Sequence, residues 1–453
     1  MKRFIQTIKN IYKIEELRKR ILYTIGIVLI YRFGSYVVLP GVDPNQLGAL
    51  KSQTSGGILG LLNMFSGGAF SNASVFALGI MPYISASIVI QLLGMAIPYF
   101  QKLQKEGESG RKKINQLTRY LTVIITGFQA PGYIANLVHQ LGNMPTAIYP
   151  FNGTPPTMFF YVASVVTLIA GTLFVMWMGE KITDKGIGNG ISMIIMVGII
   201  ARLPFALFGE FISRMEEQGG GLVIFLVELV VLVLVILVCI LLVQGTRKIP
   251  VQYAKRIVGN KQYGGVRQYI PLKVNAAGVM PIIFAQAIMF IPITLAGFAA
   301  SESLSGFVAI FSDFNGFWYN FVFAVMIIAF TYFYTAVTIN PNQMAEDMKK
   351  NGGFIPGIKP GKKTAEFLDD VMSKITLPGS MFLAFVAIMP AIVRLFGVNS
   401  QFAQFYGGTS LLILVGVVLD TLQQIESHLL MRHYDGLTKS GRIKGRTSTG
   451  MTA

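Results

Sequence analysis

The chain has 453 residues, of which 53% are hydrophobic and only 13% are charged, about half the charged fraction of a typical soluble domain. Its long apolar runs without charges indicate an integral membrane protein. The single cysteine, Cys239, excludes a disulfide framework and a metal site built from several cysteines, and three histidines leave little for catalysis or metal ligation. The net charge of +17 is typical either of nucleic-acid binding or of the cytoplasmic loops of a membrane protein.

The first 20 residues predict an amphipathic helix at a membrane surface. Phe4, Ile8 and Ile11 share one helical face, and basic residues surround that face. The basic start followed by an apolar run also resembles a signal peptide. However, Arg32 interrupts the run and no cleavage site of small residues follows it, so we expect a retained first span.

Ten apolar stretches are long enough to cross a bilayer, which takes about 20 helical residues. They lie at 21–39, 74–97, 117–138, 157–178, 187–208, 222–243, 275–297, 317–339, 377–397 and 408–427. An even number of crossings places both termini on one side. All but five of the 38 Lys and Arg fall in the loops, tails and span ends of that side, and this asymmetry predicts that both termini are cytoplasmic.

Two cytoplasmic loops are longer than membrane orientation requires. The loop 245–274 interleaves Lys and Arg with tyrosines, and the loop 340–376 has two Pro-Gly turns around Lys359. After those turns, helical spacing predicts an amphipathic helix with an apolar face of Phe367, Leu368, Val371, Met372 and Ile375. Such basic loops suit docking to RNA or to an acidic protein surface, but ordinary cytoplasmic loops have the same composition.

The stretch 54–97 combines a segment too short to span with a span that contains a proline. Residues 58–65 would rise only about 12 Å as a helix, so we expect a non-spanning, plug-like segment. Pro82 lies inside the predicted second span and predicts a broken helix there. The pattern G-[I/V]-M-P-x-I-x-A occurs at 79–86 and again at 278–285, five spans apart, which indicates two inverted halves of five spans.

Polar and charged side chains inside spans have two possible interpretations. Uncharged polar residues either join helices by hydrogen bonds or mark a seam along which helices separate. Charged residues in spans are candidates for function, although Glu228 lies near an interface and Arg202 and Arg394 can extend towards water. The other charged candidates are Arg32, Asp420 and Glu426.

The residues alone leave three classes of function: a passive polypeptide channel, a secondary transporter and an intramembrane enzyme. An enzyme requires a nucleophile with its base or metal ligands, and the sequence has no HExxH, GxSxG or phosphate-loop pattern. A transporter is expected to carry charged or carbonyl-rich groups near the midplane, where the proline-containing spans present isoleucine. Inverted repeats also describe many transporters, so the transporter stays the alternative to the channel.

Seven stretches of the sequence resemble the SecY family, the central channel subunits of bacterial protein translocation. They are YRFGSYVVLPGVD (31–43), NMFSGGAFSNASVFALGIMPYISASIVIQLL (63–93), KEGESGRKKI (105–114), GEKITDKGIGNGISMII (179–195), PLKVNAAGVMP (271–281), NPNQMAEDMKKNGGFIPGIKPGKKT (340–364) and YGGTSLLILVGVVLD (406–420). The similarity runs from about residue 15 to about residue 435 and includes every predicted span.

This resemblance implies an all-α membrane protein whose ten transmembrane helices form two inverted five-helix halves, arranged like a clamshell. The implied parts are a surface helix 1–20, a first half 21–208, a second half 209–427 and a basic tail 428–453. An aliphatic ring would close the pore between the halves, because such a ring excludes ions yet yields around a passing chain. By motif position its residues are Ile80, Ile84, Ile195, Ile283 and Ile413.

The resemblance also implies a plug, a lateral gate and docking sites. The plug, within 57–72, would contain Ile58, Leu59, Leu61, Leu62, Asn63, Met64 and Phe65. Spans 2, 3, 7 and 8 would form the gate, with the candidates Ser85, Ser87, Gln91, Gln129, Asn275 and Gln286. The two long loops would dock a cytosolic partner through Arg247, Lys248, Lys255, Arg256, Lys261 and Lys359.

Two departures from the usual family pattern affect docking. Lys359 stands where the family usually has Arg, and VQGT precedes Arg247 where ERGQ is usual. Lysine keeps the charge but loses the planar fork of a guanidinium.

The implied function is translocation of unfolded polypeptides across the bacterial plasma (inner) membrane, with sideways release of transmembrane segments into lipid. No catalytic residue, metal or cofactor is implied. The implied partners are SecE and SecG-like small membrane subunits, SecA, the ribosome, signal sequences, nascent chains and membrane lipid, with SecDF and a YidC-type insertase as further candidates.

Overall fold

The structure is a computed structural model, and it describes residues 14–48, 60, 63–141, 148, 157–216, 221–253, 256–258, 261–263, 267–286, 288–289 and 316–440. Long helices dominate these residues. The helices are α2 (Glu15–Gly34), the 3-10 helix η1 (Pro44–Gln46), α5 (Met81–Ala96), α6 (Pro98–Lys105), α7 (Glu108–Leu141), α8 (Met158–Lys185), α9 (Gly190–Glu216), α10 (Gly221–Gln244), α13 (Phe317–Thr338), α14 (Pro341–Lys350), α15 (Lys362–Leu395), α16 (Ser400–Ala403) and α17 (Gly408–Ser440).

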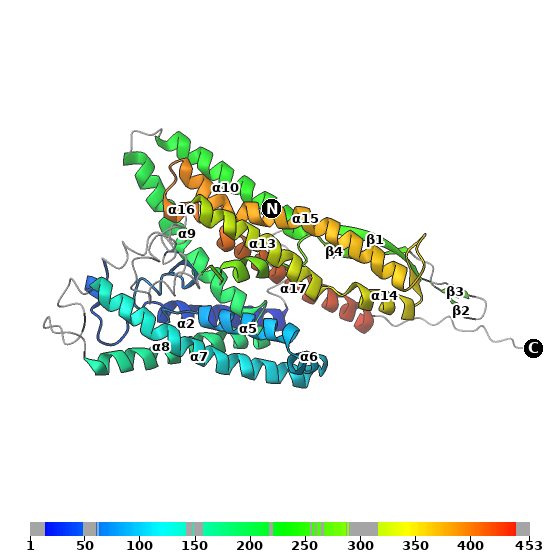
Figure 1. The fold of residues 1–453 in the computed structure, drawn as a ribbon, viewed down its shortest axis with the longest axis horizontal. Coiled ribbons are helices and arrows are strands. Elements are labelled where there is room, and N and C mark those ends of the chain that lie inside the picture. The colour runs from blue at the N-terminus through cyan, green and yellow to red at the C-terminus, as the bar shows by residue number, and fades with distance from the viewer. Residues whose placement is uncertain are drawn as a thin grey trace, which may run out of the picture.

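The helices form two layers, one from each half of the chain (Figure 1). The first layer contains α2 and α5 to α8, and the second contains α10 and α13 to α17. α9 runs between them, because it packs against α8 of the first layer and against α10, α16 and α17 of the second. α9 ends at Glu216, a little beyond the predicted boundary at residue 208.

The described helices fit a membrane protein with many spans. Seven of them are long and apolar enough to cross a membrane, and α5 with α6 makes an eighth when the pair is counted as one span. This pair bends by 102° between Gly94 and Pro98, where the predicted second span ends. α2 overlaps the predicted first span over residues 21–34, and a helix that begins at Met280 overlaps the predicted seventh span. The count of ten spans stays a prediction.

The second span differs from the prediction in where its helix begins. α5 begins at Met81 rather than near residue 74, and residues 66–80 are mostly turns. Pro82 therefore lies in the first turn of α5, where the backbone N–H has no helical partner and proline is tolerated. The prediction that Pro82 breaks a helix is wrong, because the apolar turns before it lengthen the hydrophobic run without being helical.

The internal repeat has the same local structure in both halves. Gly79 and Gly278 have φ angles of 53° and 64°, in the left-handed region that favours glycine. Two residues after each glycine a helix begins, at Met81 and at Met280. The pattern G-[I/V]-M-P thus encodes a tight turn that enters a helix.

The two long loops share one small sheet that the sequence analysis did not predict. β1 (Thr246–Tyr253) pairs antiparallel with β4 (Arg267–Lys273) and with β5 (Gly353–Phe354), in the order β4-β1-β5. Within the first loop, β2 (Arg256–Val258) also pairs with β3 (Lys261–Tyr263). A buried cluster joins the sheet to α14 and α15, and it consists of Ile249, Val251, Leu272, Met348, Ile355, Leu368 and Met372. We call this unit, residues 246–273 and 341–376, the loop platform.

α15 contains both the predicted amphipathic helix and the predicted ninth span. It runs from Lys362 to Leu395, so no loop separates the two. Its first part buries Leu368 and Met372, and Phe367 and Val371 pack against the same cluster, which agrees with the predicted apolar face.

Candidate pore and plug

Five isoleucines from both layers belong to one apolar cluster. Ile80 and Ile84 lie at the start of α5, Ile195 lies in α9, Ile283 lies in the helix that begins at Met280, and Ile413 lies in α17. Ile80, Ile195 and Ile413 are buried with 3–4% exposure, and the other two are half-buried against them. The structure therefore brings together all five residues predicted for the ring, although they come from positions more than 300 residues apart.

The repeated turn explains how the two halves present equivalent side chains. Ile80 and Ile84 are four residues apart on one helical face, and Val279 and Ile283 repeat this spacing in the other half. The N–H of Ile84 donates to the carbonyl of Ile80 at 3.1 Å, and the N–H of Ile283 donates to the carbonyl of Val279 at 3.4 Å. Val279 packs against the same cluster. It is a ring neighbour that the motif comparison missed, although the repeat itself could have identified it.

The described part of the plug segment packs against these isoleucines. Asn63, Met64 and Phe65 are buried, and Met64 and Phe65 belong to the same cluster as the ring. The segment closes on itself, because Asn63 Oδ1 accepts from the N–H of Ser71 at 3.0 Å and its carbonyl accepts from the N–H of Gly68 at 2.8 Å. The other predicted plug residues, Ile58, Leu59, Leu61 and Leu62, lie outside the described residues.

Side chains from α2 and α7 bind the plug through its backbone. The Tyr31 hydroxyl donates to the carbonyl of Ser66 at 3.2 Å, and Arg32 Nη1 donates to the carbonyl of Gly67 at 2.9 Å. The Tyr133 hydroxyl donates to a third plug carbonyl, that of Phe70, at 2.9 Å. Arg32, a charged candidate within the first span, therefore contacts the plug.

The plug backbone approaches α9 where both chains have glycine. A Cβ on Gly198 would lie 2.9 Å from the carbonyl oxygen of Phe65, and a Cβ on Gly67 would lie 2.8 Å from Cα of Gly198. Both distances are too short for ordinary contact. Gly67 also has a φ of 64°, which side-chain-bearing residues rarely adopt.

The six gate candidates do not form one hydrogen-bonded group in the described part of the chain. Gln91 Nε2 donates to Ser87 Oγ at 3.3 Å within α5, and Ser85 of the same helix is half-buried. Gln129 is exposed on α7, which packs against α5. Two further candidates are buried, and their atoms Asn275 Oδ1 and Gln286 Nε2 have no hydrogen-bond partner among the described residues.

Comparison with known proteins decides the family. The SecY family profile matches residues 74–422. The protein translocase subunit SecY of Streptomyces scabiei is 43% identical over 94% of this chain and 98% of its own length. The one from Mycobacterium bovis is 41% identical over 96% of this chain and 99% of its own length. The chain belongs to the SecY family.

Solved structures show the same fold at low identity. A protein-conducting channel has a TM-score of 0.62 at 17% identity and covers 94% of this chain and 95% of its own. A SecY channel described as sealed by its plug domain has a TM-score of 0.60 at 17% identity, with the same coverage. Sec61 in a canine ribosome–channel complex has a TM-score of 0.54 at 15% identity, again with the same coverage.

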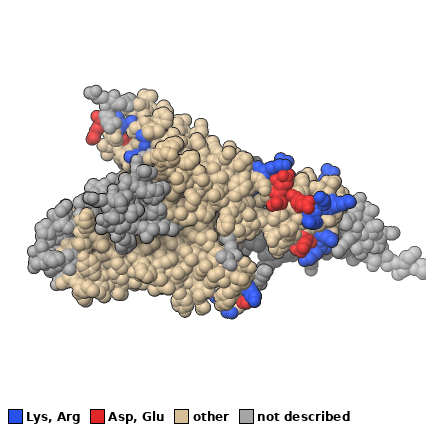
Figure 2. Space-filling model, in the orientation of Figure 1, with Lys and Arg blue, Asp and Glu red and all other residues tan. Residues whose placement is uncertain are grey.

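SecY proteins are channel subunits rather than enzymes, and this SecY-family chain is a multi-pass membrane protein. Figure 2 shows an uncharged band between a group of charged side chains at the loop platform and another near the connection of α9 to α10. Such a band is what a bilayer requires. Among the described residues, no group of three or more His, Cys, Asp or Glu could hold a metal ion.

The loop platform presents the described docking residues to solvent. Arg247 and Lys248 are exposed on β1, and Lys359 is exposed between two turns in which Gly357 and Gly361 have φ angles of 86° and 100°. Thr364 Oγ1 donates to the carbonyl of Lys359 at 3.0 Å, which further fixes this turn. Lys255 and the side chains of Arg256 and Lys261 lie outside what the structure describes.

A buried ionic cluster that joins α9 to the second layer was not predicted. Arg214 of α9 binds Glu210 of α9 at 2.9 Å and Glu228 of α10 at 2.7 Å. Arg214 Nη2 also donates to the carbonyl of Gly397 at 2.9 Å, and the N–H of Asn399 donates to Glu210 Oε2 at 2.8 Å. The sequence offered one signal, the spacing of four between Glu210 and Arg214, while the other partners are distant along the chain.

Proposed function

We propose that this SecY-family chain is the protein-conducting channel of a translocase, in a closed state. The observation that carries this proposal is the shared apolar cluster, to which ring candidates of both halves and Met64 and Phe65 of the plug belong. An apolar ring opposes the passage of ions and water, and it binds a passing polypeptide only weakly. The same cluster speaks against the transporter alternative, since a transporter site needs polar or charged ligands.

The two-layer architecture supports sideways release of hydrophobic segments into lipid. α9 connects the layers on one side, through its packing on α10, α16 and α17. Separation of the layers on the other side would move α5 and α7 away from α13 and the helix that begins at Met280.

The loop platform is proposed to dock the partner that drives translocation. Exposed Arg247, Lys248 and Lys359 suit ribosomal RNA or an acidic face of the SecA motor. The related Sec61 channel occurs in a ribosome complex. SecE and SecG-like subunits, signal sequences, nascent chains and membrane lipid complete the proposed partners, with SecDF and a YidC-type insertase as accessory ones. We place the protein in the bacterial inner membrane with both termini cytoplasmic.

Substitution within the ring tests the proposal. Ile283→Asn and Ile80→Asn should each increase ion leak through the reconstituted channel complex and allow export of substrates with defective signal sequences. Ile283→Leu keeps the volume and apolar character, so it serves as the control and should stay sealed. Unchanged leak and unchanged signal selectivity in both asparagine variants would refute the assignment of the ring.

A further inference from the structure

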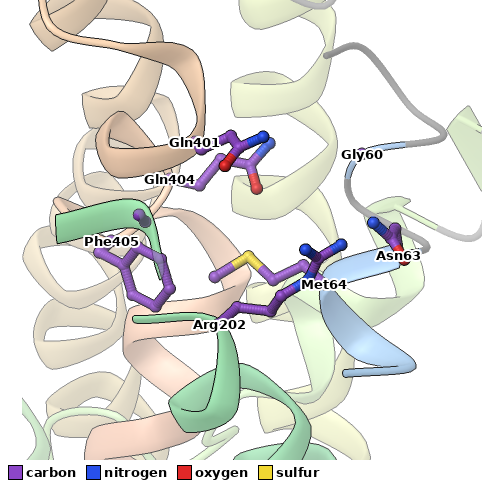
Figure 3. Close-up of a pocket in the computed structure, with 8 residues that line it drawn as sticks. Gly60, Asn63, Met64, Arg202, Gln401, Gln404 and Phe405 are labelled. Carbon is purple, nitrogen blue, oxygen red and sulfur yellow. The ribbon is translucent and has the colours of Figure 1, made fainter. Parts of the chain in front are cut away.

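A cavity beside the plug is lined by three distant segments of the chain (Figure 3). Its volume is about 30 Å³, room for about two water-sized particles. The plug contributes Gly60, Asn63 and Met64, α9 contributes Arg202 and Ala206, and α16 with the residues after it contributes Gln401, Gln404 and Phe405. We call it the plug-side cavity.

Arg202 brings to this cavity a positive charge that no carboxylate balances among the described residues. None of their ion pairs includes Arg202, and no Asp or Glu lines the cavity. Residues 49–62, whose sequence leads into the plug, also contain no acidic residue. Arg202 is half-buried, and a partly buried charge is stabilised by a counter-charge.

A second guanidinium adds to the positive charge on this side of the plug. Arg32 binds neutral groups, the carbonyl of Gly67 at 2.9 Å and the hydroxyl of Tyr36 at 3.3 Å. Arg32 Nη1 lies 2.7 Å from the position that a Cβ on Gly67 would take. Arg202 Nε lies 3.5 Å from the position that a Cβ on the next plug residue, Gly68, would take. The two arginines therefore flank one turn of the plug.

The remaining polar lining consists of amides that can donate hydrogen bonds. Asn63 uses its Oδ1 to accept from the N–H of Ser71, which leaves its NH₂ group as the available end. Figure 3 shows the side-chain amides of Gln401 and Gln404 side by side, with their oxygens on the side of Arg202. Gln401 is exposed and Gln404 is half-buried, and rotation of each amide by half a turn would bring its NH₂ group to that side. A guanidinium with three amide NH₂ groups is a donor set that suits an anion.

We propose that the plug-side cavity binds a small monovalent inorganic anion of the size of chloride, which bridges the plug to α9 and to the segment after α15. The site is complete only while Asn63 and Met64 occupy their present positions, so a bound anion stabilises the seated plug. This inference rests on the proposed function, in which the seated plug closes the channel. If the anion binds only that state, an anion concentration of nine times its Kd raises the ratio of closed to open channels about tenfold.

The test uses the purified channel complex, reconstituted in vesicles, with chloride replaced by gluconate at constant ionic strength. The leak of a neutral small solute is the readout, so that chloride is not itself the permeant. Leak should fall as chloride rises in the unchanged protein and become independent of chloride in Arg202→Gln and in Gln401→Ala. Arg394→Gln removes one charge from the end of α15 outside the cavity, and it should keep the chloride dependence of the unchanged protein.

A second measurement locates the anion without relying on channel activity. Crystals of the complex grown in bromide should show anomalous scattering at the plug-side cavity, and Arg202→Gln should abolish it. A translocating channel whose leak ignores chloride, or whose cavity holds no bromide, would overturn the anion site while leaving the proposed function intact. Bromide in the cavity of a complex that does not translocate would instead contradict the proposed function.

Discussion

Gly198 offers a direct way to test whether the plug is seated against α9. In Gly198→Ala the new Cβ would lie 2.9 Å from the carbonyl oxygen of Phe65, 3.1 Å from N of Gly67 and 3.4 Å from its Cα. The plug backbone must shift by a few tenths of an ångström to restore ordinary contact. That shift disturbs the hydrogen bond from Arg32 to the carbonyl of Gly67, because the same turn carries both contacts.

The expected cost falls on the closed state alone. Overpacking of this kind costs about 1–3 kcal/mol, which lowers the ratio of closed to open channels about 5- to 140-fold. Ion conductance of the reconstituted complex in planar bilayers measures this ratio as open probability without substrate. In a channel that also carries Met64→Cys and Ala206→Cys, the yield of the disulfide between these two positions should fall as the open probability rises, because Met64 and Ala206 line the same cavity.

The matched control for this prediction is Gly209→Ala. Gly209 lies in the same helix, and a Cβ there would meet nothing within 4 Å. Both substitutions gain the same intrinsic helix propensity, so they differ only in contact with the plug. Equal open probabilities in the unchanged protein, Gly198→Ala and Gly209→Ala would refute the seating of the plug on α9.

Three further predictions follow from other contacts. Arg214→Met should lower the free energy of unfolding by about 3–5 kcal/mol, because it leaves Glu210 and Glu228 buried and unpaired. Adding Glu210→Gln and Glu228→Gln to this variant should restore most of the thermal stability, and no recovery would contradict the ionic cluster. Reversing Arg247, Lys248 and Lys359 to Glu should weaken ribosome or SecA binding in cosedimentation, more at low salt than at high salt, whereas salt-independent binding would exclude electrostatic docking. Deleting residues 58–66 should give a leaky channel that still translocates in vesicle import, and an impermeable deletion variant would argue against the plug.

The membrane part of the fold could be predicted because the pattern that specifies it, apolar runs bounded by basic residues, is local in the sequence and strong. Uncharged apolar runs and the placement of Lys and Arg locate most spans, and the structure has apolar helices at those positions. The start of the second span was misplaced because Val75, Phe76, Ala77 and Leu78 are as apolar as the helix that follows them, although they form turns. In this stretch the high hydropathy reflects buried side chains, and it does not distinguish a helix from a series of turns.

The contacts between distant segments could not be predicted for a different reason. β1 is basic and contains Pro250, so its composition hides the strand, and its partner β5 has only two residues. Arg214 joins Glu228 of α10 to Gly397 of the turn after α15, and no single-sequence pattern specifies how these distant segments pack together. The ring candidates were identified by motif position, and the repeated turn at Gly79 and Gly278 explains why Ile84 and Ile283 take equivalent places in the two halves.

The continuity of α15 makes the loop platform one end of a lever. At 1.5 Å per residue, its 34 residues form a rod about 50 Å long that carries the platform at one end and packs along α13 within the membrane. Because β1 ties β4 to β5, a partner that pulls on either loop applies its force to the same rod. Pro378 and Pro390 lie inside α15 and each removes one helical hydrogen bond. Where the helix stays straight across these prolines, a tilt of a few degrees at the platform becomes a displacement of several ångströms at the far end.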